Sequence, residues 1–163
     1  MRESDAMLII PSRFLARLRE PIDWIDLQYG YKHHLIDGQA VIDHACRVLP
    51  EAVGENDTIL AIASSKAPDQ LGPLIDLMVG SVESPPDLSR KWALILAAFI
   101  NESDLPDKLS AIEEVYSSFD YPEELSEMVR YMPMNGPDLG SREANECRML
   151  NSLKKLSAKI VHS

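Results

Sequence analysis

The longest apolar stretch of the chain reads Trp92-Ala93-Leu94-Ile95-Leu96-Ala97-Ala98-Phe99-Ile100. It lies inside a predicted helix from about Asp87 to Asn101, and a helix without a polar face is expected at the centre of a core. We expect Trp92 and Phe99 to anchor the packing there. Nine residues fall far short of the roughly 20 needed to cross a bilayer, so we predict no membrane span.

Helical periodicity continues on both sides of this stretch. Apolar residues recur at intervals of three and four, and no alternating pattern lasts six residues, so the fold class is predicted to be all-α. We expect about eight helices, packed as antiparallel hairpins in a compact bundle or a short solenoid-like stack. Besides the central helix, the predicted segments are Asp5–Arg19 with Ser4 as N-cap, a short one around Trp24–Tyr29, one from the N-cap Asp37 to Pro50, then Asp57–Ser64, Pro68–Val79, Asp104–Phe119, Asp120–Tyr131, and one from the N-cap Ser141 through Ile160.

The length of 163 residues predicts a single domain spanning residues 1–163. A proline-rich loop at residues 81–86 is a possible boundary between two halves. Cys46 and Cys147 lie far apart without Cys-x-x-Cys spacing, and the N-terminus lacks a secretory signal. We therefore expect a cytoplasmic protein without cofactors, either a monomer or a weak dimer.

The negative charge is concentrated in residues 101–146, where twelve Asp and Glu stand against three Lys and Arg. The rest of the chain is nearly balanced, with fourteen acids and thirteen bases. Clustered carboxylates produce a local field, which predicts a basic partner and argues against direct nucleic-acid binding. The one basic run, Lys154, Lys155 and Lys159, is expected to complement the negative end of its own helix.

Inside this acidic segment, Asp120 and Glu123 have the spacing of a capping box, and Pro122 suits a first turn. We therefore predict that a helix starts at Asp120 and that Phe119 packs inward. Aromatic residues beside carboxylates favour interfaces with Arg- and Lys-rich surfaces, although a merely solvated acidic face is the simpler interpretation. The predicted partner-binding residues are Glu113, Glu114, Asp120, Tyr121, Glu123, Glu124, Glu127 and Tyr131.

No catalytic constellation is predicted. The adjacent His33 and His34, with His44, lack metal-ligand spacing, and neither a nucleophile elbow nor a phosphate loop is present. Pairs of carboxylates on a helix surface do not converge on an ion. We expect no metal site and no enzyme activity.

Several blocks resemble a family of small bacterial proteins of unknown function. They are Ile22-Asp23-Trp24 with Gly30-Tyr31, Lys91-Trp92-Ala93, the block from Asp107 to Tyr116, Phe119-Asp120-Tyr121-Pro122-Glu123 and Val129-Arg130-Tyr131-Met132-Pro133. The resemblance runs from about residue 22 to 155, and its C-terminal blocks are the specific ones. It implies a bacterial, cytoplasmic, helical protein and supplies no active site.

Acidic stand-alone proteins of this kind are often immunity proteins against polymorphic or contact-dependent toxins. The resemblance and the acidic segment together lead us to expect a protein that neutralises a cognate toxin, a basic nuclease, by stoichiometric binding. The alternative is a non-catalytic helical adaptor or regulatory module for another partner.

Overall fold

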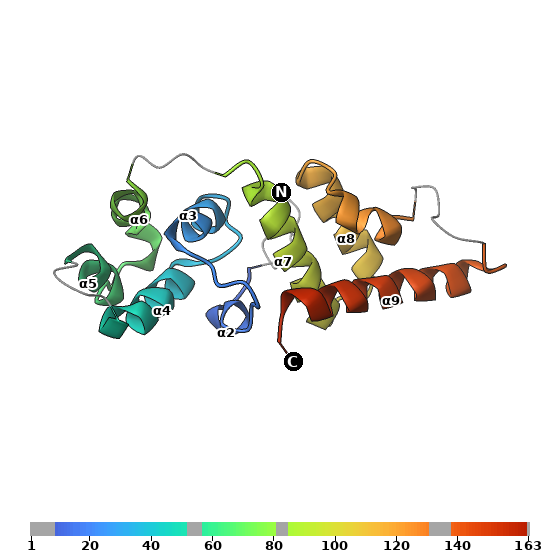
Figure 1. The fold of residues 1–163 in the computed structure, drawn as a ribbon, viewed down its shortest axis with the longest axis horizontal. Coiled ribbons are helices and arrows are strands. Elements are labelled where there is room, and N and C mark those ends of the chain that lie inside the picture. The colour runs from blue at the N-terminus through green and yellow to red at the C-terminus, as the bar shows by residue number, and fades with distance from the viewer. Residues whose placement is uncertain (1–8, 52–56, 81–84, 131–137, 163) are drawn as a thin grey trace. The chain divides into compact units, whose positions relative to one another are not determined.

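The computed structural model describes residues 9–51, 57–80, 85–130 and 138–162. These residues form helices and no β-strand, so the predicted all-α class is confirmed. The chain divides into two compact units, Met1–Pro85 and Pro86–Ser163 (Figure 1). None of the helices in the described ranges combines the length and the apolar character that a membrane span requires.

The first unit is built from short helices joined by tight turns. Its α-helices pack in the pairs α3 with α6, α4 with α5, and α2 with α4. The helices are α2 (Ser12–Leu15), α3 (Trp24–Lys32), α4 (Gly38–Val48), α5 (Asp57–Ala63) and α6 (Gly72–Val79), with 3-10 turns η1 (Leu49–Glu51) and η2 (Pro68–Gln70).

The predicted first helix, Asp5–Arg19, is wrong within the described residues. Only Ser12–Leu15 is α-helical there, and Pro11 is the N-cap in an extended conformation. Proline in a helix interior removes a hydrogen bond and clashes with the preceding turn, so the helix starts after it. The N–H of Ile10 instead donates to the carbonyl of Leu35 at 2.9 Å. The predicted start at Asp5 and the cap Ser4 lie outside the described residues.

The caps of α3 and α4 explain why these helices start where they do. Asp23 and Asp26 form a reciprocal capping box at the start of α3. The predicted cap Asp37 is confirmed, because its carboxylate accepts the N–H of Ala40 at 3.0 Å. Directly after this cap, a side chain at Gly38 would place its Cβ 1.9 Å from the carbonyl oxygen of Pro68. Glycine is therefore required for the contact between α4 and η2.

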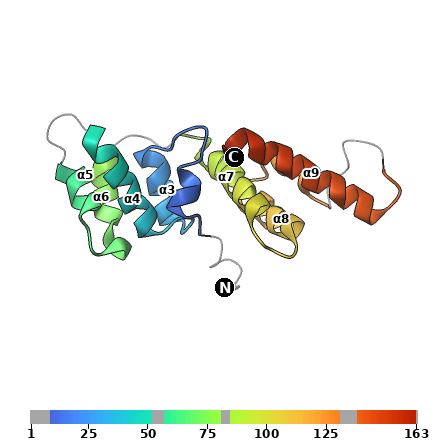
Figure 2. The same cartoon turned by 90° about the horizontal axis from the view of Figure 1, so that it is seen from below.

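The second unit is organised around α7 (Leu88–Glu102), the predicted central helix. It packs against α8 (Lys108–Ser118), η3 (Glu123–Met128) and α9 (Arg142–Ile160), as Figure 2 shows for α8 and α9. Trp92 is completely buried, as predicted, whereas Phe99 is only half-buried.

The last helix begins as predicted. Ser141 accepts the N–H of Ala144 at 3.0 Å, which caps α9. Met149 and Leu153 are buried in its apolar stripe, but Leu150 is exposed. The buried stripe of α9 therefore includes Met149 and Leu153 but not Leu150.

Candidate partner-binding site

The acidic string begins at the end of α8, and its first residues terminate that helix. Tyr121 donates its N–H to the carbonyl of Tyr116 at 2.9 Å, the 6→1 hydrogen bond of a Schellman motif with Phe119 as C-cap. Asp120 occupies the left-handed position of this motif with φ 65°, a conformation that aspartate tolerates better than most residues. The predicted capping box of Asp120 with Glu123 is therefore wrong: Asp120 ends one helix and does not start the next.

The segment that follows is a 3-10 helix, η3, where an α-helix from Asp120 to Tyr131 was predicted. Pro122 is its N-cap, and no side chain caps it. Leu125, Met128 and Val129 are buried, so η3 lies against the core of the second unit through its apolar residues. These buried residues are spaced three and four apart, which produced the helical pattern in the sequence, and a 3-10 helix shares the three-residue spacing with an α-helix.

Tyr121 is the exposed aromatic residue of this turn. Its backbone also has a positive φ, 55°, which is unusual for a bulky side chain. The ring packs edge-on against Tyr116, with centroids 5.3 Å apart, and still leaves 60% of the residue exposed. Tyr121 is thus an oriented, solvent-facing aromatic group with Asp120 and Glu123, both exposed, on either side of it in sequence.

Arg130 engages three carboxylates of the second unit, two from α8 and its N-cap and one from α9. Its Nε and backbone N–H both donate to Oε2 of Glu113 at 3.0 Å. One terminal nitrogen donates to Glu146 at 2.8 Å, and the other to Asp107 at 3.3 Å and to the hydroxyl of Ser110 at 2.7 Å. We call these five residues the Arg130 cluster; it joins α8, the end of η3 and α9.

Within the Arg130 cluster, the hydrogen bonds favour the protonated guanidinium of Arg130 and the ionised carboxylate of Asp107. The bonds to Glu113 and Glu146 raise the pKa of the Arg130 guanidinium above its ordinary value. The pKa of Asp107 is lowered, chiefly by hydrogen bonds from Ser110 and also by Arg130. Glu113, predicted as a partner-binding residue, is therefore engaged within the unit.

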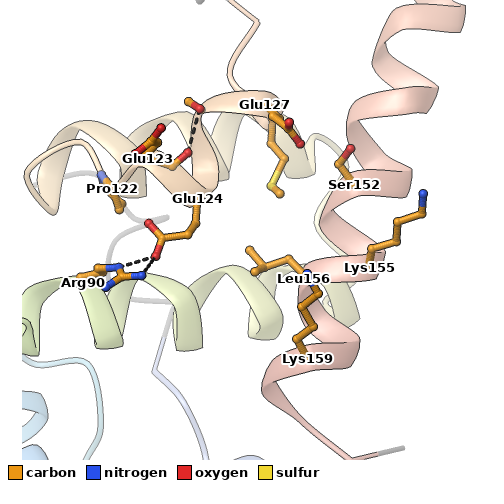
Figure 3. A pocket seen from close by; sticks show the side chains of 11 residues that line it. Arg90, Pro122, Glu123, Glu124, Glu127, Ser152, Lys155, Leu156 and Lys159 are labelled. Carbon is orange, nitrogen blue, oxygen red and sulfur yellow. Dashed lines mark hydrogen bonds and ion pairs between the residues drawn. The ribbon is translucent and has the colours of Figure 1, made fainter. Parts of the chain in front are cut away.

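Glu124 is engaged in a similar way. Its carboxylate accepts hydrogen bonds from Arg90 of α7, and this contact lowers the pKa of Glu124. The pair joins η3 to α7 (Figure 3). Glu124 thus adds less to an external acidic surface than its charge suggests.

The other predicted residues differ in their exposure. Asp120, Tyr121, Glu123 and Glu127 are exposed, and Glu114 is half-buried on α8. Tyr131 lies outside the described residues. We call Asp120, Tyr121, Glu123 and Glu127 the η3 surface.

A groove of about 920 Å³ runs beside η3, within the second unit (Figure 3). Acidic residues of η3 line one side, and Lys155 and Lys159 of α9 line the other. Leu156 lies between the two sides and supplies apolar surface. The complete lining is Arg90, Pro122, Glu123, Glu124, Ser126, Glu127, Met128, Ser152, Lys155, Leu156 and Lys159.

Sequence reasoning did not identify the basic residues of this region. Lys155 and Lys159 have the i, i+4 spacing that places both on one face of α9, which was a usable signal, but they were assigned to the helix end alone. Arg130 stands out as one of three bases in residues 101–146. Its three carboxylate partners are 16 to 23 residues away, however, and only the packing of the helices brings them together.

The histidines of the first unit take part in local packing. His33 stacks on Tyr29 with ring centroids 4.1 Å apart, and His34 has φ 59° in the Schellman motif that ends α3. His44 contacts Trp24 edge-on at 5.0 Å. Within the described ranges, no group of three or more His, Cys, Asp or Glu is arranged to hold a metal ion.

Nearly all residues of this site lie in the part of the chain that matches a known family. No curated protein and no solved structure shows significant similarity to the chain. Residues 14–156 include the Arg130 cluster, the η3 surface and every residue that lines the groove except Lys159. These residues match the model of a family described as uncharacterized protein conserved in bacteria (DUF2247), and the chain belongs to that family.

Proposed function

We propose that this protein is a cytoplasmic immunity protein that binds a cognate toxin, a basic nuclease, and blocks it stoichiometrically without catalysis. The observation that carries the proposal is the η3 surface, where three exposed carboxylates accompany an exposed, oriented tyrosine. Carboxylates that present themselves like a phosphate backbone can occupy the cleft in which a nuclease holds nucleic acid.

The charge distribution supports this role through association kinetics. The chain carries a formal net charge of -10, and the twelve acids of residues 101–146 supply most of it. Such a field steers a basic partner toward the protein and can raise the association rate by about 10- to 1,000-fold at low salt. For an inhibitor that must reach a toxin before the toxin reaches nucleic acid, fast association is the useful property.

The aromatic residue supports affinity, which charge alone supplies poorly. Interface hot spots are enriched in tyrosine, tryptophan and arginine, and they are surrounded by residues that exclude water. Tyr121 offers a large ring at low entropic cost, since the contact with Tyr116 already orients it. An arginine of the toxin could stack on this ring while it pairs with Asp120 or Glu123.

The test is co-expression with the protein encoded directly upstream, which the proposal identifies as the toxin. We expect this protein to restore growth and to form a one-to-one complex with the toxin. Replacing both Glu123 and Glu127 by lysine should slow association at least 10-fold at low salt and flatten its salt dependence.

The matched control carries the same change of charge on distant exposed acids, Glu20→Lys with Asp69→Lys in the first unit. It should slow association much less than the change on η3. Equal effects of the two variants would mean that only net charge matters. No rescue of growth by the unmodified protein would exclude the immunity function and favour the adaptor alternative.

A further inference from the structure

The groove beside η3 has a charge pattern that differs from that of the whole protein. Three of its lining residues are acids and three are bases, so its formal charge is zero while the chain carries -10. The Arg90–Glu124 pair satisfies one acid and one base internally. Glu123 and Glu127 line the η3 side of the groove, Lys155 and Lys159 line the α9 side, and all four residues are exposed.

A groove with opposite charges on its two sides disfavours ligands that carry charge of only one sign. A purely basic segment would meet Lys155 and Lys159, and a purely acidic one would meet Glu123 and Glu127. Like-charge contacts of this kind cost several kcal/mol across an interface. The groove therefore favours a ligand that carries both charges in a defined order.

An amphipathic helix meets this requirement better than an extended strand. A strand points alternate side chains to opposite faces, so only one row enters a groove, whereas a helix can present an apolar ridge with a charged row on each flank. Leu156 lies between the charged sides and suits the apolar ridge (Figure 3). A volume of about 920 Å³ lies at the upper end of the range for ligand pockets.

We infer that the groove between η3 and α9 binds an amphipathic helix of the partner protein, with its basic flank on Glu123 and Glu127 and its acidic flank on Lys155 and Lys159. This inference rests on the proposed function and deepens it, because it adds a basic half to an interface otherwise regarded as acidic. The lysines fix the orientation of the helix, and the η3 surface supplies the attraction.

The decisive experiment uses charge reversal of the lysines. If the interface were purely acidic, replacing Lys155 and Lys159 by glutamate would strengthen binding to a basic toxin. Our inference predicts the opposite, a loss of at least 10-fold in affinity for the upstream-encoded protein, measured by calorimetry.

The control places the same change outside the groove, as Lys154→Glu with Lys66→Glu, two exposed residues that do not line it. Thermal unfolding verifies that both variants are folded. Affinity that is unchanged or increased in the Lys155 and Lys159 variant, relative to this control, would overturn the inference while leaving the immunity function intact.

A second arm separates the two proposals if the upstream protein does not bind. Two labelled helical peptides of equal length are compared by anisotropy, one with a leucine ridge between a lysine flank and a glutamate flank, the other with lysines on both flanks. Preference for the first peptide, lost in the Lys155 and Lys159 variant, would support the groove although the immunity function had failed. Preference for the second, or binding of neither, would overturn the groove as well.

Discussion

Arg130 illustrates how a single side chain can determine what a charged segment does. Its guanidinium donates to Glu113, Glu146, Asp107 and Ser110, and 24% of the side chain stays exposed. Arginine suits this position because its planar fork directs several donors at once, which the point charge of lysine cannot do. Three of the twelve acids in the segment are thereby bonded to a base of their own unit.

We predict that Arg130→Met destabilises the second unit by about 2 kcal/mol, because it removes several charge-assisted hydrogen bonds and leaves three carboxylates close together. Arg130→Lys should recover only part of the loss. Urea unfolding at pH 7 measures the effect.

Arg90→Met is the matched control for this substitution. It breaks the ion pair with Glu124, but the Arg90 side chain is 60% exposed, and an ion pair this exposed contributes little to stability. Adding Glu113→Gln to Arg130→Met should restore stability by relieving the repulsion between carboxylates. Equal losses for the Arg130 and Arg90 variants would contradict a special role for the Arg130 cluster.

At the scale of elements, the ends of helices decide the geometry of the site. The Schellman motif that ends α8 places Asp120 in left-handed backbone geometry and leads directly into Tyr121 and η3. A second such motif with His34 ends α3. The Schellman motif at the C-terminus of α8 thus determines the orientation of the exposed Tyr121.

We predict that Asp120→Gly stabilises the second unit by about 0.5 to 1 kcal/mol, since glycine adopts this backbone conformation without a Cβ penalty. Ser117→Gly is the control, because Ser117 is exposed within α8 and glycine there should destabilise by about 0.5 kcal/mol. Thermal unfolding of both variants measures the two shifts. Destabilisation by Asp120→Gly would show that its carboxylate matters more than its backbone geometry.

The elements that the sequence predicted well share a simple physical basis. Asp37 and Ser141 cap their helices as expected, and α7 has the predicted position because a helix without a polar face has to be buried. The errors occur where one residue suits two roles. Aspartate is both a good N-cap and a tolerated left-handed residue, so Asp120 followed by Pro122 could be interpreted in either way.

At the scale of the whole molecule, the acids and His44 make stability depend on pH. The pKa values of Asp43, Asp76, Asp107 and Glu124 are lowered by hydrogen bonds in the folded state. Carboxylates with depressed values stabilise the fold above their unfolded pKa values, near 4, and this contribution is lost as pH falls further. Lowering the pH below these values should therefore decrease the free energy of unfolding of both units.

His44 acts at milder pH. Burial lowers its pKa from the ordinary 6.5, with a smaller contribution from the positive charge of Arg47, and Asp23 opposes the shift. The unfolded chain then binds a proton more readily than the folded one, so stability is complete above pH 6.5 and declines as pH falls below it.

We predict that unfolding of the first unit becomes easier as pH falls below 6.5, by no more than about 1.4 kcal/mol per pH unit. His44→Gln should lose most of this dependence. Trp24 lies in the first unit and Trp92 in the second. Urea titrations followed by Trp24 fluorescence, in a protein that also carries Trp92→Phe, therefore measure the unfolding of the first unit alone. The same pH dependence with and without His44 would assign the effect to other groups.

The candidate site was only partly predictable from the sequence. Asp120, Tyr121, Glu123 and Glu127 are exposed, whereas Glu113 and Glu124 bond to arginines of their own unit. Counting charges along the chain cannot reveal such pairs, because the partners are 17 and 34 residues apart. The basic side of the groove was missed for another reason, because Lys155 and Lys159 were assigned to the end of their own helix alone.

The Arg130 cluster also constrains how the family can diverge. A relative that loses the arginine would keep three carboxylates in forced proximity, so we expect such a loss to be accompanied by replacement of Glu113, Glu146 or Asp107. The four positions should therefore change together during evolution, while Glu123 and Glu127 remain free to follow the partner. Comparing the substitution patterns of these four positions with those of Glu123 and Glu127 would show which acids of the segment are conserved for folding and which change together with a binding partner.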